Sequence, residues 1–295
     1  MKVSIITELS DRIARDYGYG SIVQCLLKGL TIINANYVKH YVDDADIYLV
    51  EEWRIYDKIL PKIRDKKHIV HLHTLPRPWE PGFKVLELVY EHATAIIVPS
   101  ERIKIEACKD YPSACDKIYI VYNGVDTDYW RPLLPRLHAN YILYVGRLAE
   151  YKNWKLLVSE AKKYRYKLLL VGNEHNVFKV DDGICILGYV SKRTLRTLYR
   201  RAILHVLPSI GEPFGLVSLE AMACGTPSAV SIHAGVSEII PYDDLKFDPI
   251  EEGIPLDRLV FAAEKYRGIV RGIAQKYNCI NYAKNIYNVL LEVMR

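Results

Sequence analysis

Two glutamates in the segment SIGEPFGLVSLEAMACGTPSAV, residues 209–230, have the type and spacing of side chains in a ligand-binding loop. Glu212 lies in a stretch with glycine and proline, and Glu220 follows after seven intervening residues in a stretch typical of a helix. The first N–H groups of a helix have no acceptor within it, and the helix dipole adds positive charge there. The junction therefore predicts an anion site, and Gly215 would let the backbone approach a ligand closely.

The helical spacing also gives the second glutamate a direction. Glu220 shares a helix face with Leu216 and Val217, so we expect it to point back over the loop that holds Glu212. Taken singly, Glu212 is an ordinary charge near a helix start and Glu220 an ordinary solvated residue. Together on one loop between a strand and a helix, they favour a functional site.

Such a loop needs a strand before it, and short apolar runs alternate with amphipathic stretches along the whole chain. The runs predict buried strands at Val3–Thr7, Ile47–Val50, Ile69–His73, Ala95–Val98, Ile118–Val121, Tyr141–Val145, Lys167–Val171, Ile184–Leu187, His205–Leu207 and Ser228–Ile232. The stretches predict helices at about residues 20–33, 54–66, 83–92, 100–110, 153–164, 192–202, 216–224 and 256–268. This alternation predicts an α/β protein with parallel sheets covered on both faces.

The stretch WRPLLPRLHAN, residues 130–140, contains two prolines and no clear period, which is typical of a linker. We expect an N-terminal domain of residues 1–135, joined by a C-terminal helix over 279–295, and a second domain of residues 136–278. Two Rossmann-like domains facing a central cleft are the expected architecture, because open α/β sheets bind ligands at such clefts.

The segment with the two glutamates resembles the signature of retaining glycosyltransferases of the GT-B fold, in particular family 4 (glycosyltransferase group 1). That signature has two Glu separated by seven residues, Pro-Phe-Gly after the first, and Glu-Ala-Met-Ala-x-Gly-x-Pro at its end. All of these stand between Glu212 and Pro227. The resemblance implies a nucleotide-diphosphate sugar as donor substrate, a UDP- or GDP-sugar, and no separate cofactor.

Other segments are similar to the family in the same order along the chain. Tyr144–Leu148 followed by Lys152 is similar to its Gly-Arg-Leu…Lys segment, which binds the donor diphosphate; a forked guanidinium on Arg147 and an ammonium at one strand end suit that ligand. Ile118–Trp130 resembles the segment before the interdomain linker. His233–Ile239 resembles a Gly-Gly-x-x-Glu stretch, but departs from it in its first residues.

The N-terminal half resembles the family less closely. Gly18 and Gly20, before a helix expected from Ser21, are similar to its glycine loop, which meets the donor phosphate and sugar. His73, at the end of a predicted strand, is similar to the family's histidine near the reacting centre. His71 is expected to be a core histidine. The half is short for an acceptor domain of this family.

The resemblance implies a role for each residue. Arg147, Lys152 and the helix start at Phe214–Val217 would stabilise the leaving diphosphate. Glu220 would accept hydrogen bonds from the ribose. Glu212 and His73 are the predicted catalytic residues, with Glu212 orienting the sugar through its hydroxyls and His73 contacting the sugar from the other domain.

Two Asp-x-Asp sequences, residues 44–46 and 126–128, could suggest a metal clamp on a diphosphate. The first precedes a predicted strand instead of following one, and the second belongs to the segment before the linker. We therefore expect no metal site, because Arg147, Lys152 and the helix start supply the positive charge.

The composition, 50% hydrophobic and 25% charged over 295 residues, excludes disordered and low-complexity classes. Of the net charge of +5, the segment 147–201 holds 13 basic against 5 acidic residues. That excess favours an anionic partner, yet no nucleic-acid-binding motif accompanies it, so we expect none. The basic amphipathic stretch Arg54–His68 is better explained by packing on a sheet than by resting on an anionic membrane, and peripheral membrane contact stays open.

The cysteines and the N-terminus bear on location. The six cysteines lack CxxC spacing, so we expect buried free thiols, with Cys108 and Cys115 the pair closest in sequence. The start of the chain meets Glu8 and Asp11 too soon for a secretory signal, and no apolar run is long enough to cross a bilayer. A cytoplasmic protein is expected.

The sequence therefore predicts a retaining glycosyltransferase of the hexosyltransferase type. Its acceptor would be a hydroxyl of a glycan, a lipid or a protein. Two other readings stay open: an epimerase-like enzyme of the same fold, and a non-catalytic nucleotide-sugar binder.

Overall fold

The computed structural model describes residues 1–7, 18–75, 82–133, 140–172, 178–180 and 183–295. The chain forms two compact units, one of Met1–Gly124 with Cys279–Arg295 and the other of Val125–Asn278. The division after Gly124 lies upstream of the one expected after residue 135, and residues 134–139 of the expected linker lie outside the described part.

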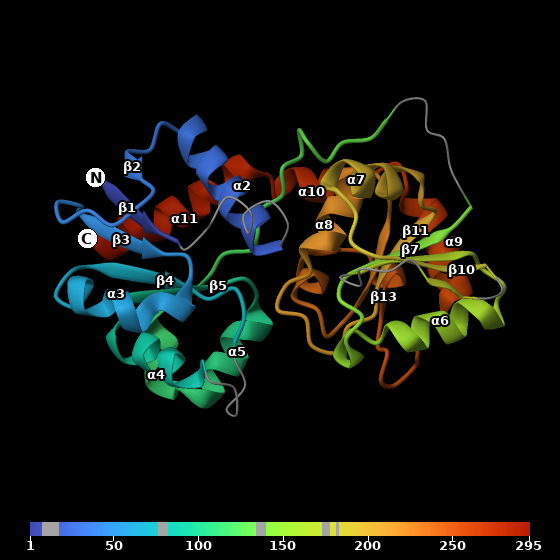
Figure 1. Ribbon diagram of the computed structural model, residues 1–295, viewed down its shortest axis with the longest axis horizontal. Helices are drawn as coiled ribbons and strands as arrows, with labels where there is room; N and C mark the ends of the chain where they lie inside the picture. The colour runs from blue at the N-terminus through green and yellow to red at the C-terminus, as the bar shows by residue number, and fades with distance from the viewer. Residues whose placement is uncertain (8–17, 76–81, 134–139, 173–177, 181–182) are drawn as a thin grey trace. The chain divides into compact units, whose positions relative to one another are not determined.

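The first unit is built on a parallel sheet with strand order β2-β1-β3-β4-β5-β6. The strands are β1 (Val3–Ile6), β2 (Tyr37–Val38), β3 (Ile47–Val50), β4 (His68–His71), β5 (Ala95–Val98) and β6 (Ile118–Ile120). The helices are α2 (Gly18–Ile32), α3 (Tyr56–Ile63), α4 (Phe83–His92), α5 (Glu101–Asp110) and α11 (Cys279–Met294), with 3-10 turns η1 (Trp53–Ile55) and η2 (Pro112–Lys117). Figure 1 shows α2 and α11 side by side on one face of this sheet and α3, α4 and α5 on the other.

The second unit is built on a sheet with strand order β13-β12-β11-β7-β8-β10-β9, parallel except for β9. The strands are β7 (Ile142–Val145), β8 (Leu168–Val171), β9 (Phe178–Val180), β10 (Ile184–Leu187), β11 (Leu204–Leu207), β12 (Ser228–Ser231) and β13 (Lys246–Phe247). The helices are α6 (Trp154–Lys163), α7 (Lys192–Arg201), α8 (Leu216–Ala223), α9 (Leu256–Tyr266) and α10 (Val270–Lys276), with 3-10 turns η3 (Glu150–Lys152), η4 (Gly235–Ile239) and η5 (Asp243–Leu245). Helices α6 and α9 complete the core on one face, and α7, α8 and α10 lie on the other (Figure 1).

These two Rossmann-like units confirm the predicted α/β class. The buried apolar runs became strands because each is covered on both faces, as a parallel sheet requires. Helix α10 and the short edge strands β2, β9 and β13 were not predicted, since runs of two to seven residues carry too little periodicity.

In each sheet there is one strand at which the chain turns from adding strands on one side to adding them on the other. The loops at the carboxyl ends of the strands on its two sides therefore run in opposite directions and leave a crevice between them. In the first unit, β1 lies between β2 and β3. In the second unit, β7 lies between β8 and β11. The residues directly after these strands are therefore the ones that each sheet can bring together around a ligand.

The expectation of free thiols is wrong for four cysteines. Cys25 of α2 and Cys279 of α11 form a disulfide over a sequence separation of 254, and Cys108 and Cys115 form a second one. Cys185 and Cys224 are free. The Cys25–Cys279 disulfide depends on the packing of α2 against α11. The spacing of cysteines along the sequence cannot predict that packing. It also runs against the expectation of a reducing compartment.

Candidate functional site

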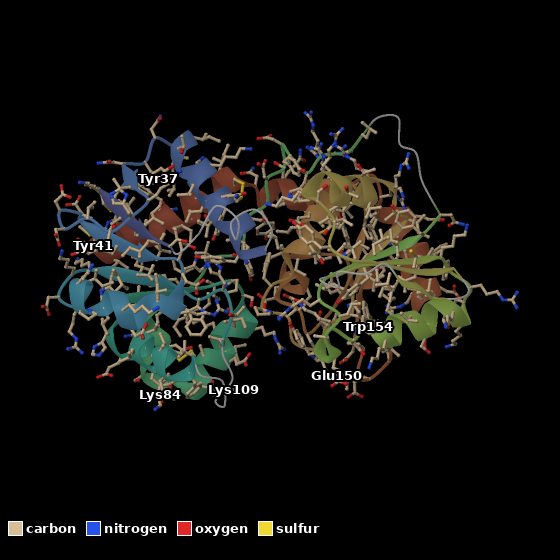
Figure 2. The ribbon with its side chains drawn as sticks, in the orientation of Figure 1. Tyr37, Tyr41, Lys84, Lys109, Glu150 and Trp154 are labelled. Atoms are coloured by element: carbon tan, nitrogen blue, oxygen red, sulfur yellow. A yellow bond between two sulfur atoms is a disulfide. The ribbon has the colours of Figure 1, made fainter. Side chains whose placement is uncertain are left out.

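In the second unit, the loops after β7 and β11 bring Lys152 and Glu212 into contact. The loops are joined by a backbone hydrogen bond from Ile210 N to Tyr151 O of 2.9 Å. Lys152 ends η3, which begins at Glu150, a residue labelled in Figure 2. Its ammonium donates to the Glu212 carboxylate, and the side chains are only 12% and 16% exposed. The resemblance implied that Lys152 binds the diphosphate and Glu212 the sugar of the same donor. In the structure, their side chains form a partly buried ion pair.

The environment of Lys152 weakens its hold on its proton. Burial, and then the charge of Arg147, lower the pKa of Lys152 to about 8. Arg147 itself is exposed and donates to the Tyr151 hydroxyl. A guanidinium and an ammonium therefore lie at the end of β7, as the sequence predicted.

The loop with Glu212 is fixed by the segment that departs from the family pattern. Glu212 N donates to His233 O at 3.3 Å, Gly235 N donates to Glu212 O at 3.0 Å, and Val236 N donates to Phe214 O at 2.7 Å. These backbone bonds need no particular side chain at His233. They explain how a substituted segment can still hold the loop.

Gly215 serves the backbone of this loop. It caps α8 with a φ of 106°, and a Cβ there would lie 2.6 Å from Leu207 Cδ2 and 3.1 Å from Val236 Cγ1. The sequence interpretation invoked close approach to a ligand, but the positive φ already favours glycine here, and a Cβ would also crowd the Leu207 and Val236 side chains. Leu216 and Val217 follow half-buried in the first turn of α8, and Phe214 is buried.

Glu220 is buried, which excludes the alternative of an ordinary solvated carboxylate. It is 6% exposed, and the Tyr199 hydroxyl of α7 donates to it at 3.2 Å. Burial raises the pKa of Glu220 to about 7, against the lowering effect of Tyr199 and Lys192. A carboxylate that titrates near neutrality is typical of functional sites.

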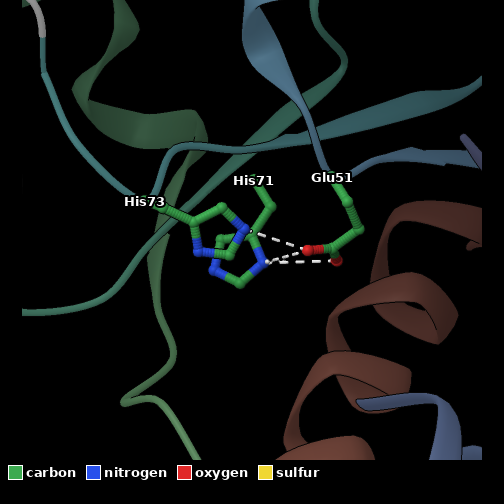
Figure 3. A group of neighbouring side chains, drawn as sticks. All are labelled: Glu51, His71 and His73. Carbon is green, nitrogen blue, oxygen red and sulfur yellow. Dashed lines mark hydrogen bonds and ion pairs between the residues drawn. The ribbon is translucent and has the colours of Figure 1, made fainter. Parts of the chain in front are cut away.

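In the first unit, residues after β3 and β4 form a second buried cluster. Glu51 directly follows β3, and its carboxylate lies 3.3 Å from His71 Nδ1 and 3.0 Å from His73 Nε2 (Figure 3). The imidazole rings lie 4.0 Å apart between centroids. Ligand atoms of these residues lie within 4.8 Å of one another, so they are potential metal ligands in the described part of the chain.

Two details of the N-terminal prediction are corrected. β4 ends at His71, so His73 follows the strand instead of ending it. Helix α2 already begins at Gly18, so Gly18 and Gly20 belong to its first turn and not to a loop before it. The residues before that helix, 8–17, lie outside the described part. Tyr19, between the glycines, packs edge-on against His73 at 5.1 Å.

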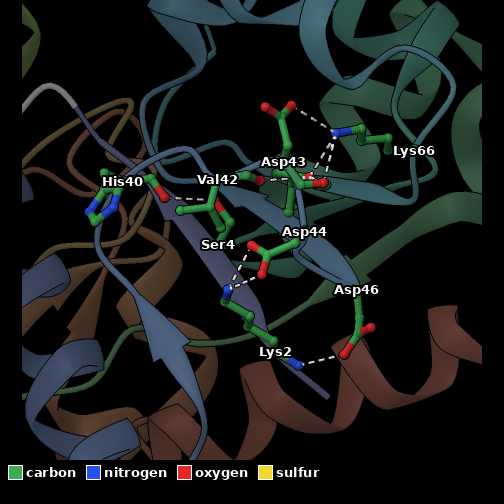
Figure 4. A network of polar contacts seen from close by, with 9 residues as sticks. Lys2, Ser4, His40, Val42, Asp43, Asp44, Asp46 and Lys66 are labelled. Atoms are coloured by element: carbon green, nitrogen blue, oxygen red, sulfur yellow. Dashed lines mark hydrogen bonds and ion pairs between the residues drawn. The ribbon is translucent and has the colours of Figure 1, made fainter.

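The acidic pairs considered as metal clamps take part in local contacts. The ammonium of Lys2 contacts Asp44 at 2.6 Å, and the Lys2 backbone N–H donates to Asp46 at 2.6 Å (Figure 4). Asp126 accepts from the backbone N–H groups of Asp128 and Tyr129. Asp44 and Asp46 precede β3 and so lie at the amino edge of the sheet, away from the carboxyl ends.

The basic stretch at Arg54–His68 packs as the favoured reading predicted. Ile55 and Ile63 are buried in the core of the first unit, with Ile59 packed against it, while Lys58 is exposed. In the described part of the chain, no helix combines the length and hydropathy that crossing a bilayer requires.

A pocket of about 510 Å³ opens at the amino ends of β7, β8 and β11, and none of the predicted site residues lines it. It lies at the opposite edge of the sheet from Lys152 and Glu212, and we do not assign the site to it.

Comparison with known proteins tests the predicted family. The family described as Glycosyl transferases group 1 matches residues 130–247, and the one described as Glycosyltransferase Family 4 matches residues 30–129. These matches support the predicted resemblance to group 1 glycosyltransferases. The predicted GT-B fold is confirmed.

Curated proteins that resemble this chain match parts of both sequences. An uncharacterised glycosyltransferase of Methanocaldococcus jannaschii is 29% identical over 245 residues, 70% of this chain and 62% of its own length. The α-maltose-1-phosphate synthase of Mycobacterium tuberculosis is 26% identical over 60% of this chain and 56% of its own. The chain thus spans about three fifths of the length of these relatives.

A solved structure gives a fuller match to this chain. HepE of Anabaena, in complex with UDP-glucose, has a TM-score of 0.78 at 14% identity, covering 99% of this chain and 100% of that one. At that identity the likeness shows the fold alone.

Sequence reasoning missed two partners in the candidate site. Glu51 directly follows β3, but no motif marked it. Tyr199 lies in the basic helix α7, and no pattern in the sequence marked it. His71, expected in the core, is fully buried but contacts Glu51.

Proposed function

We propose that this protein transfers a sugar, of the hexosyl class, from a nucleotide-diphosphate sugar to an acceptor hydroxyl with retention of anomeric configuration. The observation that supports it is the contact of Lys152 with Glu212 where the strand order of the second sheet reverses. Arg147 and the start of α8 lie on the loops of the same edge. Cations for a diphosphate and carboxylates for sugar hydroxyls are what such a donor needs.

The reaction barrier is departure of the diphosphate with positive charge developing on the sugar. Arg147, Lys152 and the N–H groups around Gly215–Val217 would stabilise the growing negative charge. When a bound diphosphate forms an ion pair with the Lys152 ammonium in place of Glu212, the carboxylate of Glu212 becomes available to orient sugar hydroxyls. The ion pair is therefore proposed to be the resting state of two ligand-binding groups.

The remaining roles are proposals too. Glu220 in its ionised form would accept hydrogen bonds from the ribose, and His73 would contact the transferred sugar. With three sources of positive charge for the diphosphate, donor binding should not require a divalent ion.

The base of the donor is proposed from a structural relative. HepE was solved with UDP and with UDP-glucose, which favours a uridine donor over GDP. The acceptor is a hydroxyl of a glycan, a lipid or a protein. Contact with an anionic membrane would use the exposed basic side chains of α3, since its apolar face is buried in the core.

A thermal-shift panel of UDP, GDP, ADP and CDP with their common sugar conjugates, with and without Mg²⁺, tests the site. Ligand that binds the folded state raises the melting temperature. We expect a shift with one nucleotide that Mg²⁺ does not alter and that Glu220→Ala abolishes. A shift equal in that variant, or none with any nucleotide, would contradict the site.

Turnover separates the proposal from its two rivals. Product formed on an added acceptor, with the donor's anomeric configuration read by ¹H NMR couplings, supports retention. An inverted product refutes retention alone. Sugar interconversion without an acceptor indicates an epimerase, and binding without turnover a non-catalytic binder.

A further inference from the structure

The cluster of Glu51, His71 and His73 contains a buried carboxylate contacted by two imidazoles, which a core histidine bonded only to backbone does not require. The Glu51 carboxylate is fully buried, yet it has an imidazole nitrogen from each of His71 and His73 within 3.3 Å. β3 and β4 are neighbours in the sheet, so the loops after them must present these residues side by side. Burying a carboxylate is costly unless hydrogen bonds compensate it, and here the imidazoles provide them.

The hydrogen-bond pattern fixes where the protons are. Two imidazole nitrogens within 3.3 Å can both donate to the Glu51 carboxylate, and that pattern requires its ionised form. An ionised carboxylate only accepts, so His73 Nε2 must carry a hydrogen and donate it. A second proton on Nδ1 would place a buried donor there without an acceptor among the described residues, so the ring is neutral. A neutral ring protonated on Nε2 has its lone pair on Nδ1.

That lone pair has no partner among the described residues. His73 Nδ1 is buried without a hydrogen bond there, on the side of the ring away from Glu51 in Figure 3. Tyr19 packs its ring edge-on against His73, and its hydroxyl is hydrogen-bonded with Thr7 at 3.1 Å. A buried acceptor left without a donor costs free energy, so the position favours an incoming hydroxyl.

We propose that Glu51 is a positioning residue, which accepts the Nε2–H of His73 and thereby presents Nδ1 as the acceptor for a hydroxyl of the sugar being transferred. The identity of that hydroxyl rests on the proposed function. The tautomer of His73 does not, because it is a property of the protein alone. The family resemblance implied that His73 contacts sugar, but it named no partner that orients the ring.

A metal ion held by the same three residues is the competing explanation, and the outer ring nitrogens weigh against it. Histidines that bind metal almost always donate their other N–H to a carboxylate, a carbonyl or water. Among the described residues, neither His71 Nε2 nor His73 Nδ1 has such a partner. Shared hydrogen bonds to Glu51 account for the inner nitrogens without a cation.

Imidazole ¹⁵N shifts of the full-length protein test the tautomer directly. His73 is assigned by its absence from His73→Gln, and we expect the Nε2–H form at pH 7. In Glu51→Gln the amide offers one acceptor and one donor, so at least one ring must change tautomer or lose its bond. Glu52→Gln is the matched control, because that carboxylate contacts Arg54 instead of an imidazole. The Nδ1–H form in the unaltered protein would overturn the proposal, and this measurement needs no variant to fold beyond the assignment.

Kinetics test whether the oriented nitrogen is used. Glu51→Gln should lower kcat by on the order of tenfold or more, with the donor KM within about twofold, and Glu52→Gln should change neither. A kcat that is unchanged in Glu51→Gln or in His73→Gln overturns the role. Stoichiometric transition metal in the purified protein that Glu51→Gln loses also overturns it. If no donor and acceptor react at all, the proposed function fails, and the tautomer measurement still decides the link between Glu51 and His73.

Discussion

Burial makes the charge of Glu220 depend on pH near neutrality. Its pKa is raised from 4.5 to about 7, so between these values the folded state holds a proton that the unfolded chain has released. The stability contribution of this group is therefore present below about pH 4.5 and lost as the pH rises through about 7.

Glu220→Gln should remove this dependence, since glutamine is close in shape and stays neutral. Each unit of pKa shift corresponds to about 1.4 kcal/mol, so the melting temperature of the variant minus that of the unaltered protein should grow by at least about 3 °C from pH 4.5 to pH 8. Glu251→Gln, at an exposed carboxylate, should show no such growth. A constant difference for Glu220→Gln would mean that the carboxyl is not held neutral.

Lys152 should make the affinity for a diphosphate depend on pH above neutrality. Its pKa is lowered to about 8 by burial and by Arg147, so the ammonium is lost as the pH rises through that value. The affinity for a nucleoside diphosphate, measured by calorimetry, should therefore fall between pH 7 and pH 9. Lys152→Ala should weaken binding by about tenfold at pH 7, the scale of a hydrogen bond to a charged group, and abolish the pH dependence.

Lys155→Ala provides the control for that measurement. Lys155 lies three positions further along, is exposed, and sits over the Trp154 ring. It should leave both the affinity and its pH dependence unchanged. Equal losses in the two variants would mean that general positive charge, and not the Lys152 position, attracts the ligand.

At the scale of elements, α2 and α11 approach so closely that one position between them admits only glycine. A Cβ at Gly29 would lie 2.1 Å from the Cys279 carbonyl oxygen and 2.5 Å from the Ala283 Cβ. The first contact is backbone, which cannot rotate away as a side chain would. The close packing of α11 therefore depends on the absence of a side chain at Gly29 as well as on the apolar face of α11.

Gly29→Ala should destabilise the first unit by about 1–3 kcal/mol, the usual cost of overpacking. Gly272→Ala is a matched control within α10, because nothing lies within 4 Å of a Cβ there. It should be neutral or stabilising by roughly 0.5–1 kcal/mol, because alanine is the better helix former. Urea unfolding of both variants measures the difference, and equal stabilities would refute the close approach.

At the scale of the whole molecule, the Cys25–Cys279 disulfide joins α2, near the N-terminus, to the C-terminal helix α11. The sequence separation of 254 includes the entire second unit. A cross-link of that length removes much conformational freedom from the unfolded chain. The second disulfide, Cys108–Cys115, closes a loop of only a few residues and should contribute less.

Cys25→Ser with Cys279→Ser should lower the stability of the first unit by about 2–5 kcal/mol. Cys108→Ser with Cys115→Ser should lower it by less, and dithiothreitol should have no further effect on a variant lacking both pairs. Thermal melts with and without the reductant provide the comparison. If the long-range pair proves reduced by mass spectrometry in the native protein, its proposed contribution is absent.

The sequence by itself determined the fold class, the family resemblance and the loops that carry chemistry. Apolar periodicity is local, so nearly all the longer strands and helices could be predicted from it. The spacing of Glu212 and Glu220 and the position of Lys152 are written in the chain in the same way. Only the tertiary structure decided which groups meet: Lys152 with Glu212, Tyr199 with Glu220, His71 and His73 with Glu51 through ion pairs or hydrogen bonds, and Cys25 with Cys279 through a disulfide. These partners are 60, 21, 20, 22 and 254 residues apart, and they meet because strand order and helix packing bring distant loops together. Burial then sets their protonation, and burial is a property of the packed molecule, not of any segment of its sequence.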